Sequence, residues 1–420
     1  MVKSKQSVAI ISTEVVPYSK VGGLADVIGS LPDNLEELGI QVTIFTPLYH
    51  GINREEFGIK KQKVDGPLEV IVAGRNEKFK VYHTVKPGTK IDVFFIDHKG
   101  FYGREGVYTK PNTGEAFEDE DERTIFLNRA VLRAIKALGI KPDVLHCNDF
   151  HTGLIPAYMK LEKEFKEHFK NTSSVFSIHN LAYQGLFDKS FIKKAGFKDT
   201  LFYPMSPFEF YGKVNVMKIA ISYADVISTV SKTYAEEISS SPEYGYGLEG
   251  ILRTRRKELV GVLNGIDAEQ WNPATDKLIP FNYSIDNLYG KMKNRIELLK
   301  EYSLPPKTKA PVIGMVSRLV DQKGLDILAE AFPKLMKMNL KLVILGTGLK
   351  KYHDLYSKLA RKHYRKFGLK LEFNNRLAHI IEAGSDFFLM PSLYEPCGLN
   401  QMYSLRYGTC LLYTSDAADE

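Results

Sequence analysis

Cysteine and tryptophan are scarce in this chain of 420 residues, which contains three of the first and one of the second. Cys147, Cys397 and Cys410 form no C-x-x-C pair, so we expect neither a structural zinc site nor a disulfide framework. No apolar run approaches the roughly 20 residues of a membrane span. The apolar stretch at 8–11 is too short for the core of a secretion signal. The sequence therefore predicts a cytoplasmic protein with no membrane association.

Two widespread enzyme motifs are missing as well. The chain has no G-x-x-x-x-G-K-[ST] segment and no G-x-S-x-G segment, which disfavours a P-loop kinase and an α/β-hydrolase. The formal net charge is +7, which suits an anionic substrate. No basic stretch is interleaved with aromatic residues as in a nucleic-acid site. We therefore expect no nucleic-acid partner.

Short apolar runs alternate with glycine loops and helical spacing along the chain. The first set is a strand at 8–11, a glycine loop, apolar residues at helical spacing over 24–38, and a strand at 42–45. This order opens a doubly wound α/β domain. Further strands are expected at 91–96, 143–146, 174–178, 224–230, 312–316, 341–345 and 387–390. The pattern and the length predict two Rossmann-like domains facing each other, with the boundary near 255–262.

The segment from Lys20 to Asp26 lies where the first strand hands over to a helix. Paired glycines let a backbone approach a ligand closely, and a helix N-terminus offers N–H groups to an anion. Lys20 adds a positive charge that suits phosphate. A Gly-Gly loop alone is more often only a turn, but this context makes Lys20, Gly22 and Gly23 candidates for phosphate binding.

The segment Ser317–Gly324 follows an apolar strand in the second half of the chain. Ligands of α/β sheets bind beyond the carboxyl ends of strands. Arg318 and Lys323 are therefore candidates to clamp a diphosphate and to neutralise charge on a leaving group, although either residue alone also fits a solvated loop.

The segment Pro391–Asn400 again follows an apolar strand and precedes a helix. Glu395 is a candidate acceptor of hydrogen bonds from sugar hydroxyls. The amides from Gly398 to Asn400 are candidates to bind phosphate at the helix start. Cys397 more often packs than reacts, because no base lies beside it in the sequence.

Histidines and acidic residues also gather in places that invite a metal hypothesis. His146–His151 and the segment from His179 follow two strands, but their spacing matches no zinc site, and polar groups facing a cleft explain them better. Asp119-Glu120-Asp121 matches a D-x-D metal motif on paper. It precedes an amphipathic helix expected over 123–138, where carboxylates favour the helix dipole. We therefore expect no metal and no other cofactor.

Taken together, these segments resemble the family of bacterial glycogen synthases and plant starch synthases. The resemblance runs from about Val8 to Thr409. It rests on Lys-x-Gly-Gly-Leu-Ala-Asp-Val, His-Asn-Leu-Ala-Tyr-Gln-Gly, Leu-Asn-Gly-Ile-Asp, Ser-Arg-Leu-x-x-Gln-Lys-Gly and Glu-Pro-Cys-Gly-Leu, which occur in the family's order. The resemblance implies the GT-B fold, two Rossmann-like domains around a cleft. It also implies glucose transfer with retention from ADP-glucose, or in some members UDP-glucose, to an α-1,4-glucan such as glycogen, with no active-site metal.

The resemblance further implies roles for the residues that match the motifs. Catalytic roles fall on Arg318, Lys323, Glu395, His179 and Asp149. Substrate-binding roles fall on Lys20, Gly22, Gly23, Asp26, Asn180, Asn264, Cys397, Gly398, Leu399 and Asn400. Members of the family often carry Trp where this chain has Phe150, which keeps a stacking face but removes an N–H donor.

The family pattern stops after Thr409. Members continue with an apolar residue, a strand and a second Thr-Gly-Gly loop, whereas residues 410–420 resemble a translated sequencing adapter. We therefore expect an N-terminal domain at 1–258 on the acceptor side, an incomplete nucleotide-sugar-binding domain at 259–409, and a foreign tail at 410–420. The strand at 387–390 is then expected to lack its flanking elements.

Three alternative functions stay open at this point. Another GT-B enzyme, of a sucrose or trehalose type or one using UDP-glucose, would share Arg318 and Lys323 but not the Lys20–Gly23 opening. A glucan phosphorylase would need a lysine-bound pyridoxal phosphate. An inactive glucan- or nucleotide-binding fragment is the third alternative, because the C-terminal domain is expected to be incomplete.

Overall fold

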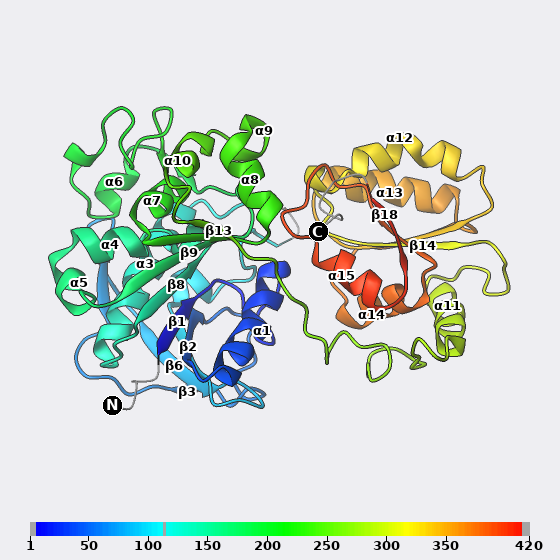
Figure 1. Cartoon of the computed structure of the whole chain (residues 1–420), viewed down its shortest axis with the longest axis horizontal. Coiled ribbons are helices and arrows are strands. Elements are labelled where there is room, and N and C mark those ends of the chain that lie inside the picture. The colour runs from blue at the N-terminus through cyan, green and yellow to red at the C-terminus, as the bar shows by residue number, and fades with distance from the viewer. Residues whose placement is uncertain (1–5, 112–114, 414–420) are drawn as a thin grey trace. The chain divides into compact units, whose positions relative to one another are not determined.

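A computed structural model describes residues 6–111 and 115–413, which form two compact units (Figure 1). The first unit includes Glu115–Asn264, and the second begins at Gly265. The division predicted after residue 258 falls just before the strand Leu259–Gly261, which belongs to the sheet of the first unit. Within the described ranges, no helix is both long enough and apolar enough to cross a membrane.

The first unit is built on a sheet of nine strands in the order β13-β12-β9-β8-β1-β2-β7-β6-β3. Neighbours from β13 to β7 are parallel, and β6 is antiparallel to both β7 and β3. The strands of this sheet are β1 (Ser7–Ile11), β2 (Gln41–Pro47), β3 (Lys60–Lys61), β6 (Lys80–Val85), β7 (Asp92–Asp97), β8 (Val144–Asn148), β9 (Ser173–Ile178), β12 (Val226–Thr229) and β13 (Leu259–Gly261). Two small antiparallel pairs lie beside it, β4 (Glu69–Val72) with β5 (Arg75–Lys78) and β10 (Leu186–Phe187) with β11 (Val214–Asn215).

Helices of the first unit fill the connections between these strands. They are α1 (Gly23–Glu37), α2 (Lys99–Tyr102), α3 (Glu120–Ala137), α4 (Ile155–Leu161), α5 (Lys163–His168), α6 (Phe191–Lys194), α7 (Val216–Tyr223), α8 (Lys232–Ser240), α9 (Pro242–Gly245) and α10 (Glu249–Thr254), with the 3₁₀ turns η1 (Phe150–Thr152) and η2 (Asp199–Leu201). The strands and the helices predicted in this half from apolar runs and spacing are confirmed, with ends that differ by a few residues. The central strands are buried on both faces, which is why their sequences are continuous apolar runs.

The second unit has a parallel sheet in the order β16-β15-β14-β17-β18. Its elements are α11 (Tyr289–Glu301), β14 (Val312–Val316), η3 (Asp321–Lys323), α12 (Leu325–Leu335), β15 (Lys341–Leu345), α13 (Lys350–Lys362), β16 (Phe367–Lys370), α14 (Asn375–Gly384), β17 (Phe387–Met390), α15 (Leu399–Arg406) and β18 (Cys410–Tyr413). The strands predicted at 312–316, 341–345 and 387–390 are confirmed with the same ends.

Two apolar clusters cover the two faces of this second sheet, because side chains alternate along each strand. Leu342 and Ile344 of β15 pack with α12 and α13 in one cluster, and Val343 and Leu345 pack with α11 and α14 in the other. Figure 1 shows these helix pairs on opposite sides of the strands. The second unit is therefore doubly wound, as predicted.

The expectation that the strand at 387–390 lacks a neighbour on its outer side is wrong. Strand β18 pairs in parallel with β17, with Phe387 opposite Cys410 and Met390 opposite Tyr413. Leu411 packs against the cluster formed with α11 and α14. The run Cys-Leu-Leu-Tyr is apolar enough to serve as a strand whatever its origin. The remaining residues of the predicted tail, 414–420, lie outside the described part of the chain.

Candidate active site

The carboxyl ends of three strands meet at one edge of the first sheet, because β1 pairs in parallel with β8 and β8 with β9. The loop that contains Lys20 follows β1. Asp149 follows β8, and His179 follows β9. The predicted site residues of the first unit therefore share the edge at which ligands of α/β sheets bind.

The loop after β1 is held by a glutamate that sequence reasoning missed. Glu14 is 3% exposed, and its carboxylate accepts hydrogen bonds from the amide of Val21, from the amide of Gly22 at 2.8 Å and from the hydroxyl of Tyr108 at 2.6 Å. The amide of Gly22, which we expected to face a phosphate, is thus engaged within the chain. The only signal in the sequence is an acidic residue three positions beyond a buried strand.

Gly22 itself occupies open space. Its φ of −143° is extended backbone that any residue adopts, and a side chain there would meet no atom within 4 Å. Neither backbone conformation nor packing requires glycine at this position. The absence of a side chain therefore leaves room for a ligand at the N-terminus of α1.

Lys20 and Asp26 form an ion pair, with 2.6 Å between Nζ and Oδ1. Both side chains are partly exposed, at 23% and 17%. Asp26 lies in the first turn of α1 and anchors the lysine beside the helix N-terminus. Asp26, a predicted substrate-binding residue, therefore contacts Lys20 through its carboxylate.

Asp149 has an unusual backbone at the end of β8. Its φ is 55°, which non-glycine residues rarely adopt and which costs roughly 1–3 kcal/mol. The carboxylate accepts a hydrogen bond from the amide of His179 at 2.8 Å, which ties the two strand ends together. Phe150 follows, and its ring stacks on that of His151 with centroids 3.7 Å apart. Strain of this kind gathers at functional sites.

His179 is a neutral hydrogen-bonding group in this setting. Burial lowers its pKa to about 4. Its Nε2 lies 2.9 Å from Oδ1 of Asn148, whose amide donates to the carbonyl of Ile11. Asn180 accepts from the amide of Ala182 at 3.1 Å and shapes the following turn. The backbone amide of Asn264 donates to the carbonyl of Val230, which follows β12, the parallel neighbour of β9.

The D-x-D segment is a helix start, as predicted, since α3 begins at Glu120. Each of its carboxylates pairs with a cation. Asp119 accepts two hydrogen bonds from Arg104, Glu120 accepts from Arg123, and Asp121 accepts from Lys194, all between 2.6 and 2.7 Å. Over the residues that the structure describes, no group of three His, Cys, Asp or Glu side chains is placed to hold a metal ion.

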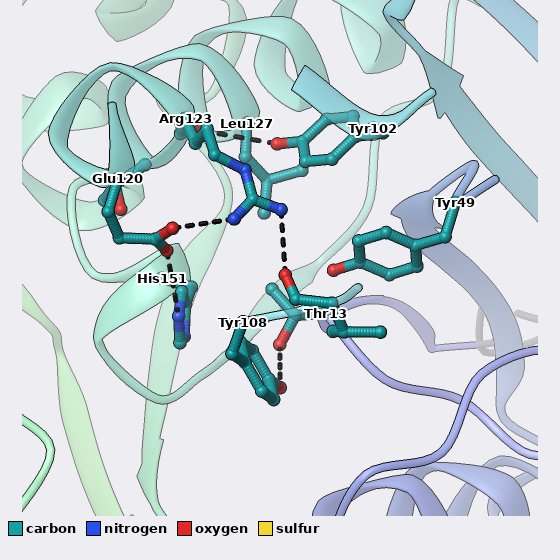
Figure 2. Close-up of a pocket in the computed structure, with 10 residues that line it drawn as sticks. Thr13, Tyr49, Tyr102, Tyr108, Glu120, Arg123, Leu127 and His151 are labelled. Atoms are coloured by element: carbon teal, nitrogen blue, oxygen red, sulfur yellow. Dashed lines mark hydrogen bonds and ion pairs between the residues drawn. The ribbon is translucent and has the colours of Figure 1, made fainter. Parts of the chain in front are cut away.

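A small cavity lies among the side chains of Thr13, Tyr108, Arg123 and His151 (Figure 2). Its volume of about 10 Å³ suits one water molecule and excludes a sugar. Glu120 links Arg123 to His151 across it, and the rings of Tyr108 and His151 lie 4.8 Å apart. The cavity is therefore too small for a sugar. It is lined by Thr13, Tyr49, Tyr102, Val107, Tyr108, Glu120, Arg123, Thr124, Leu127 and His151.

In the second unit, the loops after β14 and β17 meet because these two strands are neighbours. Lys323 Nζ lies 2.5 Å from Oε1 of Glu395, and the same oxygen accepts from the hydroxyl of Ser392 at 2.6 Å. Glu395 is almost fully buried, so its carboxylate needs these donors. The structure thus brings together two predicted catalytic residues.

Gly324 permits this close approach of the loops. Gly324 has φ 62°, and a side chain there would come within 1.7 Å of the carbonyl oxygen of Pro391. Gly398 has φ 70° and precedes α15, which begins at Leu399. The side-chain amide of Asn400 donates a hydrogen bond to the carbonyl of Val316 at 2.7 Å. This contact holds the start of α15 beside the end of β14, the strand that Arg318 follows in the sequence.

Comparison with known proteins finds family matches and relatives over nearly the whole chain. The starch synthase catalytic domain family matches residues 7–254, and the glycosyl transferases group 1 family matches residues 300–417. A glycogen synthase of Thermosipho africanus (strain TCF52B) is 45% identical over 98% of this chain and 84% of its own length. A glycogen synthase 1 of Geobacter sulfurreducens (strain ATCC 51573 / DSM 12127 / PCA) is 40% identical over 97% of this chain and 80% of its own length.

A solved structure has the same fold. The catalytic domain of starch synthase IV from Arabidopsis thaliana, bound to ADP and acarbose, superposes with a TM-score of 0.88 at 31% identity. The match covers 98% of this chain and 83% of that one. The two doubly wound units are accordingly the two Rossmann-like domains of the GT-B fold. The chain belongs to the glycogen and starch synthase family of glucosyltransferases.

Proposed function

We propose that the chain transfers glucose from ADP-glucose to the non-reducing end of an α-1,4-glucan with retention of configuration. The observation that carries this proposal is the ion pair of Lys323 with the buried Glu395 at the ends of β14 and β17, in a chain of this family. The ADP and acarbose held by the related starch synthase are a nucleotide and a glucan-like sugar, which supports the choice of donor and acceptor.

In the second unit, Arg318 and Lys323 bind the donor diphosphate. Negative charge grows on the leaving phosphate as the glucosidic bond breaks, so preorganised cations there stabilise the transition state. Glu395 holds Lys323 in place and binds the donor glucose. The backbone of Cys397, Gly398, Leu399 and Asn400 at the N-terminus of α15 provides further donors to phosphate or sugar.

In the first unit, Lys20 and the start of α1 at Gly22 and Gly23 bind the donor phosphates. Asp26 keeps Lys20 beside this helix N-terminus. The absent side chain of Gly22 admits the phosphate. The first unit therefore contributes charge and a helix dipole to the donor site.

We assign sugar recognition in the first unit to residues that follow β8 and β9. His179 and Asn180 contact the glucosyl group, and Asp149 lies at the reacting centre or the acceptor. Because burial keeps the pKa of His179 near 4, its imidazole acts as a neutral hydrogen-bonding group at neutral pH. Asn264 contributes from the end of the first unit. No metal or other cofactor takes part.

We place the enzyme in the cytoplasm. We assign the acceptor and the donor roles to its two predicted domains. The unit that ends at Asn264, predicted as residues 1–258, is the acceptor-side domain, and the unit that begins at Gly265, predicted as 259–409, is the nucleotide-sugar-binding domain. The test is an assay of the full chain with ADP-glucose and glycogen, with UDP-glucose in a parallel reaction. We expect glucan growth with ADP-glucose, and we expect the new linkage to show the α-anomeric signal by NMR. Absence of transfer from ADP-glucose together with transfer from UDP-glucose would refute the proposed donor.

A further inference from the structure

Glu14 holds two backbone amides of the glycine loop. One carboxylate oxygen accepts from the two consecutive amides of Val21 and Gly22. The segment before them is closed by a bridge between Val15 and Ser19. Hydrogen bonds to a charged acceptor are stronger than neutral ones, and a buried carboxylate without donors is costly. The part of the loop that directly follows Lys20 is therefore held by the side chain of Glu14.

Tyr108 fixes the other oxygen of Glu14. Its hydroxyl has a single proton, which it donates to Glu14 at 2.6 Å, so the hydroxyl of Thr13 at 2.7 Å donates to the Tyr108 oxygen. Burial and the charge of Glu14 hold the pKa of Tyr108 well above its ordinary value, so the phenol remains a donor over the working pH range. The donor that orients Glu14 is thus permanent.

The ring of Tyr108 also reaches the turn after β8. It lies against the ring of His151, with centroids 4.8 Å apart and an interplanar angle of 30° (Figure 2). His151 in turn stacks on Phe150, which directly follows the strained Asp149. A continuous set of contacts within the first unit therefore runs from the glycine loop through Glu14 and Tyr108 to the turn that carries Asp149.

We propose that Glu14 and Tyr108 are positioning residues that hold the glycine loop of Lys20–Gly23 and the turn of Asp149–His151 in one fixed arrangement for glucosyl transfer. This inference rests on the proposed function and deepens it. It assigns the two loop amides to Glu14, so the phosphate contacts of the first unit come from Lys20 and the N-terminus of α1. Neither Glu14 nor Tyr108 touches the substrate in this account.

The test compares Glu14→Gln and Tyr108→Phe in the full chain, with Tyr102→Phe as the matched control. Tyr102 is a buried tyrosine that lines the same cavity, and its hydroxyl donates to the carbonyl of Arg123 at 3.3 Å. Misplacement of a reacting group costs up to about 10²-fold in rate, so we expect kcat to fall 10- to 100-fold in Glu14→Gln with KM for ADP-glucose changed less than threefold. We expect a smaller fall in Tyr108→Phe, and no more than a twofold change in Tyr102→Phe.

A second readout separates positioning from other roles. Hydrogen exchange of a peptide covering residues 15–24 should be faster in Glu14→Gln than in wild type and unchanged in Tyr102→Phe, because the two loop amides lose their charged acceptor. The kcat of the double variant Glu14→Gln/Tyr108→Phe should be no lower than the kcat of Glu14→Gln alone, because the two residues act as a unit. If Glu14→Gln fails to fold, Tyr108→Phe serves for both readouts.

Three results would overturn the inference. They are a kcat of Glu14→Gln within threefold of wild type, a fall in kcat without faster loop exchange, and equal effects in Tyr102→Phe and Tyr108→Phe. Failure of the proposed function has a different signature, because wild type would then transfer glucose from neither nucleotide sugar. Loop exchange would still decide in that case whether Glu14 holds the two amides.

Discussion

Lys323 Nζ and Glu395 Oε1 lie 2.5 Å apart, although the two residues are separated by 72 positions in the chain. Their side chains are 18% and 6% exposed. A buried carboxylate that orients a cation preorganises that cation before the substrate arrives, so little reorganisation is needed during the reaction. In the proposed mechanism the pair therefore preorganises Lys323 for the reaction. Removal of one partner would also destabilise the fold, since it leaves the other without its counter-charge.

Replacement of Lys323 by alanine should lower kcat by about 10²-fold or more, the scale of losing one preorganised electrostatic contact. The matched control is Lys351→Ala, because Lys351 also pairs with a carboxylate of the same unit, that of Asp321, but is exposed on the surface. We expect the control to stay within twofold of wild type. Steady-state kinetics with ADP-glucose decide the matter. A Lys323→Ala enzyme within threefold of wild type would remove Lys323 from the mechanism.

Chelation should leave the activity intact. The carboxylates of Asp119, Glu120 and Asp121 are all paired with cationic side chains at the start of α3. A metal would have to displace these partners. We expect the rate of glucan growth in EDTA to match the untreated rate. Loss of activity in EDTA that Mn²⁺ restores would contradict this and would make the D-x-D segment a metal site.

The stability of the chain should fall on mild acidification. Burial lowers the pKa of His146 to about 4, with a further contribution from His179, whose own pKa burial also lowers to about 4. The unfolded chain binds these protons near pH 6.5 and the folded chain only near pH 4. The free energy of unfolding is therefore at its full value above about pH 6.5 and decreases as the pH drops from about 6.5 to about 4.

Urea unfolding across this pH range measures the effect. His146→Gln should flatten the dependence between pH 6.5 and 4, since one fewer proton is taken up on unfolding. His50→Gln, a substitution of an exposed histidine, is the matched control. The same slope in wild type and His146→Gln would contradict the prediction.

Strand β18 should stabilise the second unit through one face only. Leu411 packs against the cluster formed with α11 and α14, whereas the next residue, Leu412, is 38% exposed. A charge buried without a partner is costly, so Leu411→Asp should destabilise the unit by about 2 kcal/mol or more. Leu412→Asp should stay within about 0.5 kcal/mol, as surface changes do. Thermal unfolding of the two variants makes the comparison, and equal effects would mean that β18 does not pack as described.

The element plan of this protein could be predicted from its sequence. Strands at 312–316, 341–345 and 387–390 are continuous apolar runs bounded by polar loops, and buried parallel strands require that local composition. The position of Arg318 and Lys323 just beyond such a strand is also local information, and the family motifs add the chemistry. These features depend on residues a few positions apart.

The contacts within the site were decided only by the tertiary structure. Lys323 contacts Glu395 because β14 and β17 are neighbours in the sheet. Glu14 contacts Tyr108 because the segment that contains Tyr108, 94 residues later, folds back onto the loop after β1. Strand order and loop closure set such pairs, and no local pattern encodes them. The same reason explains why β18 was not foreseen, since an apolar tetrapeptide becomes a strand only when a neighbouring edge accepts its hydrogen bonds.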